Sequence, residues 1–451
     1  MKGLMISIFD YELLDAELLA DIVSVSKATL LKWEKSGKLL PVFNASGGKQ
    51  YRLSQLSGFP EIEKMSASNW ALESQTIPHR TYSSIELFAG AGGLAVGLEK
   101  AGFEAVALNE LEKHACNTLR TNRPNWNVIE GDVRALDFTI FKGVDFVSGG
   151  FPCQAFSYAG HQLGFEDTRG TLFFEFARVL KETQPKVFMA ENVRGLLEHD
   201  DGKTLAVILS VIADLGYTLC ASPTVLKAIF YQVPQKRERL ILVGVRNDLV
   251  KYAKFTWPAP YQRILTLKDA LKAGALYDCD VPESSGQTYP KNKKDILAHV
   301  PQGGYWRDLP DNLQREYMQG SYFLTGGKTG MARRLSWDAP SLTLTCSPAQ
   351  KQTERCHPEE TRPLTVREYA RIQTFPDDWH FAGPITSQYK QIGNAVPINL
   401  AWAVGRSVIR LLNSIEENML QTHQCSTSHE ASTPSKSKPI EKQSTLFEFA
   451  D

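Results

Sequence analysis

A cysteine stands in the segment 149–157 (GGFPCQAFS), directly after an apolar run that is typical of a buried strand. Cys153 is therefore placed for nucleophilic attack, because a thiolate on a loop at the edge of a sheet can reach a ligand. A carboxylate, Glu191, follows the next apolar run, and Arg237 and Arg239 in QKRER share one face of an entering strand. A nucleophile, a proton donor and a pair of cations would thus converge on one pocket. The alternative, an inert core thiol, is disfavoured by the position of this cysteine in a loop where ligands bind.

A glycine-rich segment, 88–93 (FAGAGG), closes an earlier apolar run and opens a helical pattern. Glycines there let the backbone approach a ligand closely, with helix N–H groups directed at it. Two later runs end in acids, Glu110 and Asp132, and an acid at the end of the second strand can bind the hydroxyls of a ribose. No GKS or GKT follows the glycines, so a P-loop is excluded and the set fits an adenosine better than a triphosphate. The alternative is that these acids cap helices.

The elements that must position these residues are short apolar runs alternating with helical patterns from Tyr82 onward. Strand–helix alternation with runs that are apolar on both faces predicts a mostly parallel sheet covered by helices. Such sheets bind ligands at the carboxyl ends of their strands, where the residues above lie. The predicted strands are 83–88, 103–109, 144–150, 186–192 and 239–245, and the predicted helices are 93–102, 111–122, 171–182, 203–216 and 398 to about 413.

The order of the motifs resembles that of the DNA (cytosine-5) methyltransferases over residues 82–415. The motifs are FAGAGG, NE, GD, GGFPCQAFS, DTRGTLFFEFARVL, ENV, QKRER, RPLTVREYARIQTFP and QIGNAVP. The resemblance implies an α/β fold: a Rossmann-like catalytic domain that depends on S-adenosyl-L-methionine, with an inserted target-recognition domain.

The resemblance also implies a mechanism on a flipped-out cytosine. The Cys153 thiolate adds to C6, C5 then accepts the methyl group of S-adenosyl-L-methionine, and loss of the C5 proton with β-elimination frees the enzyme. Adding a thiolate pushes charge onto N3 and O2, and positioned charges that meet it are usually a large share of catalysis. Glu191 would protonate or hydrogen-bond N3, and Arg239, with Arg237 nearby, would hold O2. C6 is shielded inside a duplex, so the base must leave the stack.

The family pattern assigns further residues to the cofactor and to duplex DNA. Those expected around S-adenosyl-L-methionine are Phe88, Gly90, Gly92, Glu110, Asp132, Val133, Pro152, Leu172, Asn394 and Val396, although Leu172 and Val396 could be plain core residues. Those expected on the DNA are Gln154, Ser157, Arg169, Arg333, Arg334, Thr343 and Thr345. No residues have the spacing of metal ligands, so we expect no metal site.

The pattern divides the chain into domains. Residues 12–62 read as two short helices, a tight turn and a small β wing, and resemble a winged helix-turn-helix of the mercury-resistance-regulator type. We hypothesise that this unit binds DNA and represses the protein's own promoter; the alternative is a small helical cap without DNA contacts. The other predicted parts are a linker (63–80), the catalytic domain (81–250 and 362–415), the target-recognition domain (251–361) and a disordered tail (416–451).

Composition bounds the remaining possibilities. The 451 residues carry 50 basic and 50 acidic side chains, which excludes a protein that is basic over its whole surface but not a local DNA-binding patch. Seven scattered cysteines without a CxxC pair indicate a reducing cytosol, and the absence of an apolar run of about 18 residues argues against a membrane span. In the tail, Gln443, Leu446 and Phe447 of QSTLF resemble a peptide that binds the bacterial sliding clamp; the alternative is an untethered tail. We expect a monomer in the bacterial cytoplasm, associated with the nucleoid.

The leading prediction is an enzyme that methylates C5 of a cytosine in a specific duplex DNA sequence and protects host DNA from a cognate restriction endonuclease. One alternative is an RNA cytosine-5 methyltransferase, which would need a much reduced DNA-reading insert. The other is a DNA-binding regulator with an inactive methyltransferase domain, against which the intact Cys153, Glu191 and paired arginines argue.

Overall fold

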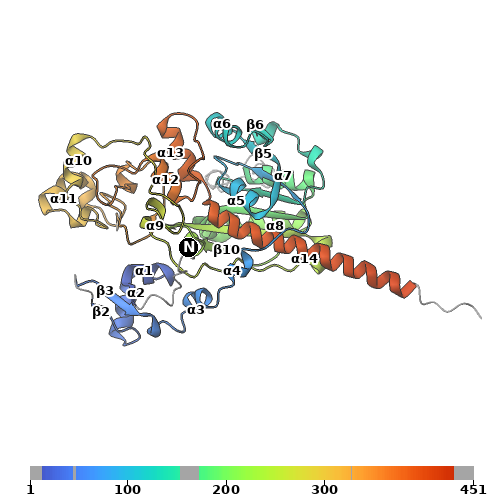
Figure 1. Ribbon diagram of the computed structural model, residues 1–451, viewed down its shortest axis with the longest axis horizontal. Coiled ribbons are helices and arrows are strands. Elements are labelled where there is room, and N and C mark those ends of the chain that lie inside the picture. Colours follow the sequence, from blue (N-terminus) through green and yellow to red (C-terminus); the bar gives the residue numbers. More distant parts are fainter. Residues whose placement is uncertain (1–12, 44–46, 153–171, 327, 431–451) are drawn as a thin grey trace, which may run out of the picture.

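A central sheet with its helices carries an N-terminal unit and an inserted part beside it (Figure 1). The computed structural model describes residues 13–43, 47–152, 172–326 and 328–430. Secondary-structure bounds below refer to those residues.

The central sheet is mixed. Its strands follow the order β10-β12-β8-β7-β4-β5-β6, and β9 also pairs with β12. The run from β6 to β8 is parallel, as predicted, whereas β12 is antiparallel to β8, β9 and β10, which the prediction of a mostly parallel sheet missed. The bounds are β4 Tyr82–Leu87, β5 Phe103–Glu110, β6 Val128–Glu130, β7 Phe146–Gly149, β8 Val187–Val193, β9 Tyr217–Leu219, β10 Thr224–Lys227 and β12 Glu238–Arg246.

The antiparallel course of β12 decides which residues meet at the ligand edge. Arg239 lies opposite Val193 at the carboxyl end of β8, and Ile241 lies opposite Glu191. A parallel strand would begin at the other edge of the sheet and carry its first residues away from Glu191. The reversed strand direction therefore brings the predicted arginine and carboxylate together.

Helices cover both faces of the sheet (Figure 1). Strand β8 shows the two-sided burial: Val187 and Met189 belong to the core with α5 (Gly93–Ala101) and α14, and Phe188 and Ala190 to the core with α7 (Leu172–Thr183) and α8 (Lys203–Asp214). Successive side chains of a strand point to opposite faces, so a continuous apolar run fits a sheet that is buried twice. Helix α6 (Lys113–Asn122) lies beside β5 and β6.

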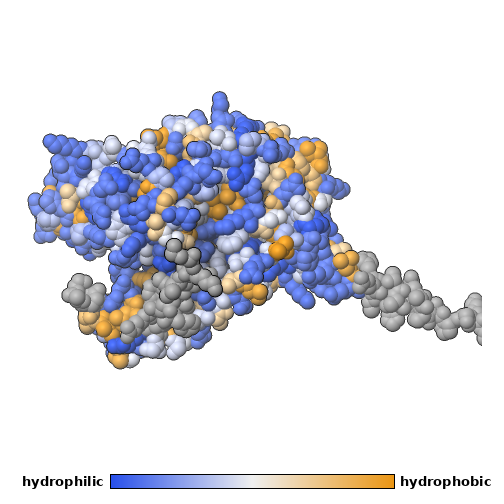
Figure 2. Space-filling view, in the orientation of Figure 1, coloured by the Kyte–Doolittle hydropathy of each residue, from blue (hydrophilic) through white to orange (hydrophobic). Residues whose placement is uncertain are grey.

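The last helix is longer than predicted. Helix α14 spans Ile398–Glu430, so the predicted end at about residue 413 is wrong and the first part of the predicted disordered tail is helical. Its end projects from the body of the molecule (Figure 1). By length and composition the stretch Ile385–Thr422 could cross a membrane, but 83% of its apolar window is buried inside the protein, as in the core helix of a folded domain. Figure 2 shows a largely hydrophilic face with scattered apolar residues.

The N-terminal unit combines a three-stranded sheet, in the order β1-β3-β2, with three helices. The Ser26 hydroxyl caps the second helix by accepting a hydrogen bond from the Thr29 N–H at 3.1 Å, and Gly37 (φ 73°) follows its end. The spacing of Leu13, Leu14, Leu18 and Leu19 predicts a helix from Leu13 onward, which is wrong at its start because Leu13 and Leu14 lie in β1. The bounds are β1 Leu13–Asp15, α1 Ala16–Ile22, α2 Lys27–Lys35, β2 Val42–Phe43, β3 Lys49–Arg52, a 3-10 turn at Leu53–Gln55 and α3 Pro60–Ser66.

The predicted linker 63–80 is not an irregular polar connection. It contains the end of α3 and all of α4 (Trp70–Glu73). Trp70 is buried against Tyr261 and Trp402, with ring centroids 5.5 and 5.7 Å away, and the Arg406 guanidinium lies 4.4 Å from its ring. A buried aromatic side chain removes about 150–250 Å² from water, so Trp70 anchors this stretch to the main core.

The inserted part is held by its own small core. That core includes Leu297, Trp306, Tyr317, Met318 and Cys356. Helix α9, at the start of the inserted part, instead packs with α12 and α13, which follow it. The inserted part therefore leaves and rejoins the catalytic unit at one place. The bounds are α9 Leu267–Leu271, α10 Lys291–Leu297, α11 Asp311–Met318, β13 Ser341–Leu342, α12 Val366–Ile372 and α13 Ile385–Asn394.

Candidate active site

A cavity of about 790 Å³ opens at the carboxyl ends of the parallel strands. This volume lies within the range of roughly 300–1,000 Å³ that is usual for cofactor and substrate sites. Of the residues predicted around the cofactor or the reacting base, the described ones that line it are Phe88, Gly90, Glu110, Asp132, Val133, Pro152, Leu172, Glu191, Arg237, Arg239, Asn394 and Val396.

The glycine-rich turn and Glu110 form one side of this cavity. The Gly90 N–H donates to Glu110 Oε2 at 2.7 Å, and the N–H groups of Leu111 and Glu112 donate to Oε1 at 2.9 and 2.8 Å. Three backbone donors hold the carboxylate in one orientation, and Oε2, which accepts only one of these bonds, keeps a lone pair for a ligand hydroxyl. The predicted ribose-binding acid is therefore pre-positioned by the loop that approaches the ligand.

Gly92 differs from the other described residues that were predicted around the cofactor. It does not line the cavity but precedes α5 with φ 87°, in the left-handed region that favours glycine. A Cβ at this position would lie 2.8 Å from Leu119 Cδ2 and 3.2 Å from a Trp379 ring atom. Gly92 thus shapes the turn, and its contact with the cofactor stays a prediction.

Asp132 lines the cavity, but its side chain turns toward a neighbour. Its carboxylate accepts hydrogen bonds at 3.0 Å from the backbone N–H and the Nε of Arg134. These bonds lower the pKa of Asp132 to about 2. Val133 beside it is buried and offers an apolar surface.

Glu191 and Arg239 form an ion pair on the adjacent wall. Glu191 Oε1 lies 2.5 Å from Arg239 Nε, and each side chain is only 12% exposed. Gly150, at the end of β7, gives this pair its space, because a Cβ there would lie 2.8 Å from Glu191 Oε2. A buried carboxylate held by a guanidinium is a preorganised group of the kind that can meet charge on a ring.

Arg237 is anchored differently from Arg239. It is 1% exposed, and its guanidinium donates to the carbonyls of Leu344, Gly393 and Asn394 at 3.4, 3.1 and 3.4 Å. Burial and the nearby charge of Arg239 lower its pKa. The predicted catalytic pair therefore separates into Arg239, which holds Glu191, and Arg237, which joins the insert to the C-terminal end of α13.

The predicted nucleophile Cys153, together with Gln154, Ser157 and Arg169, lies outside the described residues. The chain leads to it through Phe151 and Pro152, which line the cavity. Asn192 fixes the backbone just before Cys153, since its Nδ2 donates to the Phe151 carbonyl at 2.9 Å in the protein interior. The sequence analysis predicted a role for Glu191 of the ENV motif but none for Asn192. A polar residue within a buried strand could have indicated it.

Glu86 is a second residue at the cavity that the sequence analysis did not predict. It lines the cavity from inside β4, and burial together with the nearby Glu110 raises its pKa well above the ordinary value. Within the described part of the chain, no hydrogen-bond partner satisfies its Oε2. A charged residue within the apolar run SSIELF could have indicated it. A ligand donor at this point would fit the site, as would the hydroxyls of a ribose at Glu110.

The predicted DNA-reading residues divide into two groups. Thr343 and Thr345 line the cavity, and their hydroxyls donate to the carbonyls of Lys236 and Ser347 at 2.5 and 3.2 Å. Arg333 is 14% exposed and pairs with Glu17 at 3.6 Å. Neither threonine nor Arg333 is freely exposed.

Arg334 is wrongly predicted as a DNA contact. It is buried, and its guanidinium donates to the carbonyls of Leu297, Val300, His357 and Glu360 and to the Thr361 hydroxyl. All three of its nitrogens are engaged inside the insert. Its role is to hold the insert together.

Comparison with known proteins agrees with this geometry. The model of the family described as C-5 cytosine-specific DNA methylase matches residues 82–410. The chain is 64% identical over 400 residues to the type II methyltransferase M.Eco47II of Escherichia coli, which covers 88% of this chain and 95% of the relative. It is 60% identical over 408 residues to M.PspPI of a Psychrobacter strain, which covers 90% and 98%.

Among solved structures, the fold is similar to that of a DNA modification methyltransferase encoded within an E. coli prophage. The TM-score is 0.54 at 24% identity, over 74% of this chain and all of that one. The 400-residue match to M.Eco47II is longer than residues 82–451, so it includes part of the N-terminal unit.

Proposed function

Because the chain belongs to the C-5 cytosine-specific DNA methylase family, we propose that Cys153, Glu191 and Arg239 act together at the described cavity. The protein is a type II DNA cytosine-5 methyltransferase of a restriction-modification system, and it uses S-adenosyl-L-methionine. The relatives at 60–64% identity are named type II methyltransferases, and the matching family is described as a DNA methylase, which disfavours both the RNA methyltransferase and the inactive regulator.

The proposed reaction begins when the Cys153 thiolate adds to C6 of a cytosine that has left the duplex. Glu191 hydrogen-bonds or protonates N3, and the Arg239 guanidinium keeps Glu191 oriented and meets the charge at O2. S-adenosyl-L-methionine supplies the methyl group for C5 when bound. Loss of the C5 proton and release of the thiolate then restore the free enzyme. The observation that carries this proposal is the 2.5 Å Glu191–Arg239 pair beside the chain that leads to Cys153.

We propose that Glu110 binds the ribose hydroxyls and that Phe88, Gly90, Asp132, Val133, Pro152, Leu172, Asn394 and Val396 complete the cofactor site. Arg237 is a positioning residue. The insert is the proposed target-recognition domain, with Thr343 and Thr345 at its border with the cavity.

The test is covalent capture on a duplex that contains 5-fluorocytosine, in which fluorine replaces the C5 proton that must leave, so the thiolate cannot be released after methyl transfer. The wild-type enzyme with S-adenosyl-L-methionine should become attached at Cys153, and Cys153→Ser should not. Glu191→Gln should slow the capture while retaining cofactor binding. Attachment that persists in Cys153→Ser would contradict the assignment.

We also propose that the N-terminal unit is a winged helix-turn-helix that binds DNA and represses the protein's own promoter. In its support, Lys32 and Lys35 are exposed on α2, the helix that such a unit would place against DNA. The full-length Lys32→Ala/Lys35→Ala variant should shift promoter DNA less than wild type in electrophoresis and should methylate at the wild-type rate. Equal shifts would favour the helical cap without DNA contacts.

Three further proposals concern the surroundings of the enzyme. We propose protection of host DNA beside a cognate endonuclease, and a monomer in the bacterial cytoplasm near the nucleoid. Docking on a sliding clamp through Gln443, Leu446 and Phe447 rests on residues outside the described part of the chain. Purified clamp should retain the wild type but not Leu446→Ala/Phe447→Ala, and equal retention would contradict docking through these residues.

A further inference from the structure

The N-terminal unit completes its core with residues from the rest of the chain. Ile229, just after β10, and Ile264, before α9, are 2% and 3% exposed and belong to the same cluster as Leu19, Ile22 and Leu30. Separating the unit would return these apolar surfaces to water, at roughly 25 cal/mol for each Å². The unit is therefore docked on the catalytic part and is not a freely tethered module.

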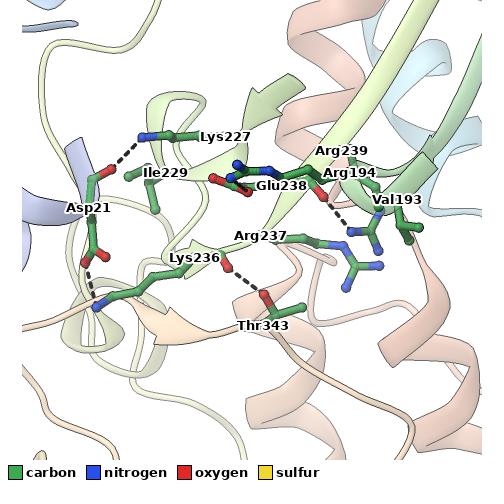
Figure 3. Close-up of a pocket in the computed structure, with 11 residues that line it drawn as sticks. Asp21, Val193, Arg194, Lys227, Ile229, Lys236, Arg237, Glu238, Arg239 and Thr343 are labelled. Atoms are coloured by element: carbon green, nitrogen blue, oxygen red, sulfur yellow. Dashed lines mark hydrogen bonds and ion pairs between the residues drawn. The ribbon is translucent and has the colours of Figure 1, made fainter. Parts of the chain in front are cut away.

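A polar junction lies beside this apolar contact (Figure 3). Lys236 Nζ lies 2.6 Å from Asp21 Oδ2 and 3.0 Å from Glu17 Oε1, and its side chain is only 16% exposed. Lys227 Nζ donates to the carbonyls of Asp21 and Ile22 at 2.6 and 3.0 Å, where it meets the negative end of helix α1. Two lysines of the catalytic part thus fix the last turn of α1.

Lys236 is shared by two acids whose pKa values move in opposite directions: at Asp21, burial outweighs Lys236 and raises the pKa. Burial alone would raise the pKa of Glu17, but the positive charges around it, foremost Lys236, lower that pKa to about 2. Removing one partner of a mostly buried ion pair leaves the other charge uncompensated. The contact therefore resists separation.

The backbone of Lys236 joins a third part of the molecule. Its strand, β11 (Gln235–Lys236), pairs in parallel with β13 of the insert, with Lys236 opposite Leu342. The Lys236 carbonyl accepts the hydrogen bond from the Thr343 hydroxyl, and the next residue, Arg237, is the arginine that binds three carbonyls. One residue thus touches the N-terminal unit, the insert and the active-site strand.

This junction borders the active site directly. A second cavity, of about 330 Å³, lies between Asp21 and Lys236 on one side and Arg239 on the other. It shares Val193, Arg237, Arg239 and Thr343 with the larger cavity. A displacement of Lys236 would therefore reach both Thr343 and the start of β12.

We propose that Lys236 is a positioning residue, and that Glu17 and Asp21 of the N-terminal unit hold it so that the insert at Thr343 stays in register with the Glu191–Arg239 pair. The inference rests on the proposed roles of Glu191 and Arg239. It gives the N-terminal unit a part in methyl transfer that is separate from any promoter binding.

The test is a double-mutant cycle on the full-length enzyme with Lys236→Met, Asp21→Asn and the combination. The readouts are the single-turnover rate of tritium transfer from labelled S-adenosyl-L-methionine to unmethylated phage DNA, the cofactor Kd, and DNA binding across salt concentrations. The matched control is Lys49→Met, which removes an ion pair of equal length, 2.6 Å to Glu34, that lies wholly inside the N-terminal unit.

Lys236→Met should lower the single-turnover rate by about 10- to 100-fold, because a displacement of about 1 Å remote from the chemistry can cost about 100-fold. Cofactor affinity and the salt slope should stay unchanged. Asp21→Asn should lower the rate less, the combined variant should lose no more than Lys236→Met, and Lys236→Arg should retain most of the rate. Lys49→Met should match wild type.

Two results would overturn the proposal. One is a wild-type rate in Lys236→Met. The other is a Lys236→Met enzyme whose salt slope for DNA binding falls by about 0.9 while Asp21→Asn binds DNA more tightly, since that would make Lys236 a phosphate contact. Failure of the catalytic assignment is seen separately, as methylation that survives in Glu191→Gln.

Discussion

Gly150→Ala tests the geometry of the active site with a single methyl group. The new Cβ would lie 2.8 Å from Glu191 Oε2, whereas ordinary contact begins at 3.4 Å, so the carboxylate or the backbone must move by about 0.6 Å. Glu191 cannot move freely, because its other oxygen lies 2.5 Å from Arg239 Nε. Gly150 does not have a positive φ, so the alanine adds no backbone strain of the left-handed kind.

A shift of this size should slow methyl transfer about 10- to 100-fold, since a displacement of about 1 Å can cost 100-fold. That corresponds to about 1.4–2.7 kcal/mol in the barrier. The assay is the single-turnover rate on unmethylated phage DNA, with the cofactor Kd and thermal unfolding measured beside it. Both of the latter should stay close to wild type.

The matched control is Gly195→Ala, where the added Cβ meets nothing within 4 Å and φ is not positive. This variant should keep the wild-type rate. If Gly150→Ala methylated as fast as wild type, the claim that Glu191 must be held in this position would be wrong.

Three further predictions concern stability and the approach to the nucleophile. Asn192→Leu leaves the buried Phe151 carbonyl without its 2.9 Å hydrogen bond, which should cost about 1–3 kcal/mol in urea unfolding and slow covalent capture of 5-fluorocytosine DNA. Burial raises the pKa of Asp145, but hydrogen bonds from Arg80 and other donors outweigh it, so the pKa is lowered on folding. The stability that this carboxylate contributes is therefore present above the unfolded pKa of about 3.9 and is lost as pH falls through the folded pKa. Asp145→Asn should therefore unfold at lower urea than wild type at pH 7, with the difference vanishing in acid; a constant difference at every pH would contradict this. Gly92→Ala should lower stability by about 1–3 kcal/mol because of its positive φ, and a loss of cofactor affinity without destabilisation would restore Gly92 as a ligand contact.

Much of the catalytic part follows from local patterns. Apolar runs such as VFMAEN and the glycines of FAGAGG carry their strand and turn preferences within a few residues, so the parallel strands and the ligand edge could be predicted. The same patterns failed where local and distant preferences compete. Leu13 and Leu14 fit a helix by spacing, yet the pairing of β1 with β3 makes them strand residues.

The polar side chains could be identified but their partners could not. Four arginines are equivalent as residue types, yet the structure gives each a different partner. Arg237 binds three carbonyls, Arg239 the Glu191 carboxylate, Arg333 an acid of the N-terminal unit, and Arg334 the interior of the insert. An arginine binds whatever acceptors surround it, and these acceptors come from segments far apart in the chain. The residue types therefore predicted a DNA contact at Arg334 that is structural.

By itself the sequence determined the order of the motifs and the position of Phe88, Gly90 and Glu110 at the carboxyl edge of the sheet, and it predicts Cys153 as the nucleophile, because these depend on residue type and short-range periodicity. Only the tertiary structure decided that β12 is antiparallel to β8, that Asn192 donates a hydrogen bond to the Phe151 carbonyl, and that Lys236 pairs with Glu17 and Asp21 of the N-terminal unit. Each of these depends on which distant donor and acceptor come within about 3 Å of one another, and a hydrogen bond at that distance is set by the packing of whole elements.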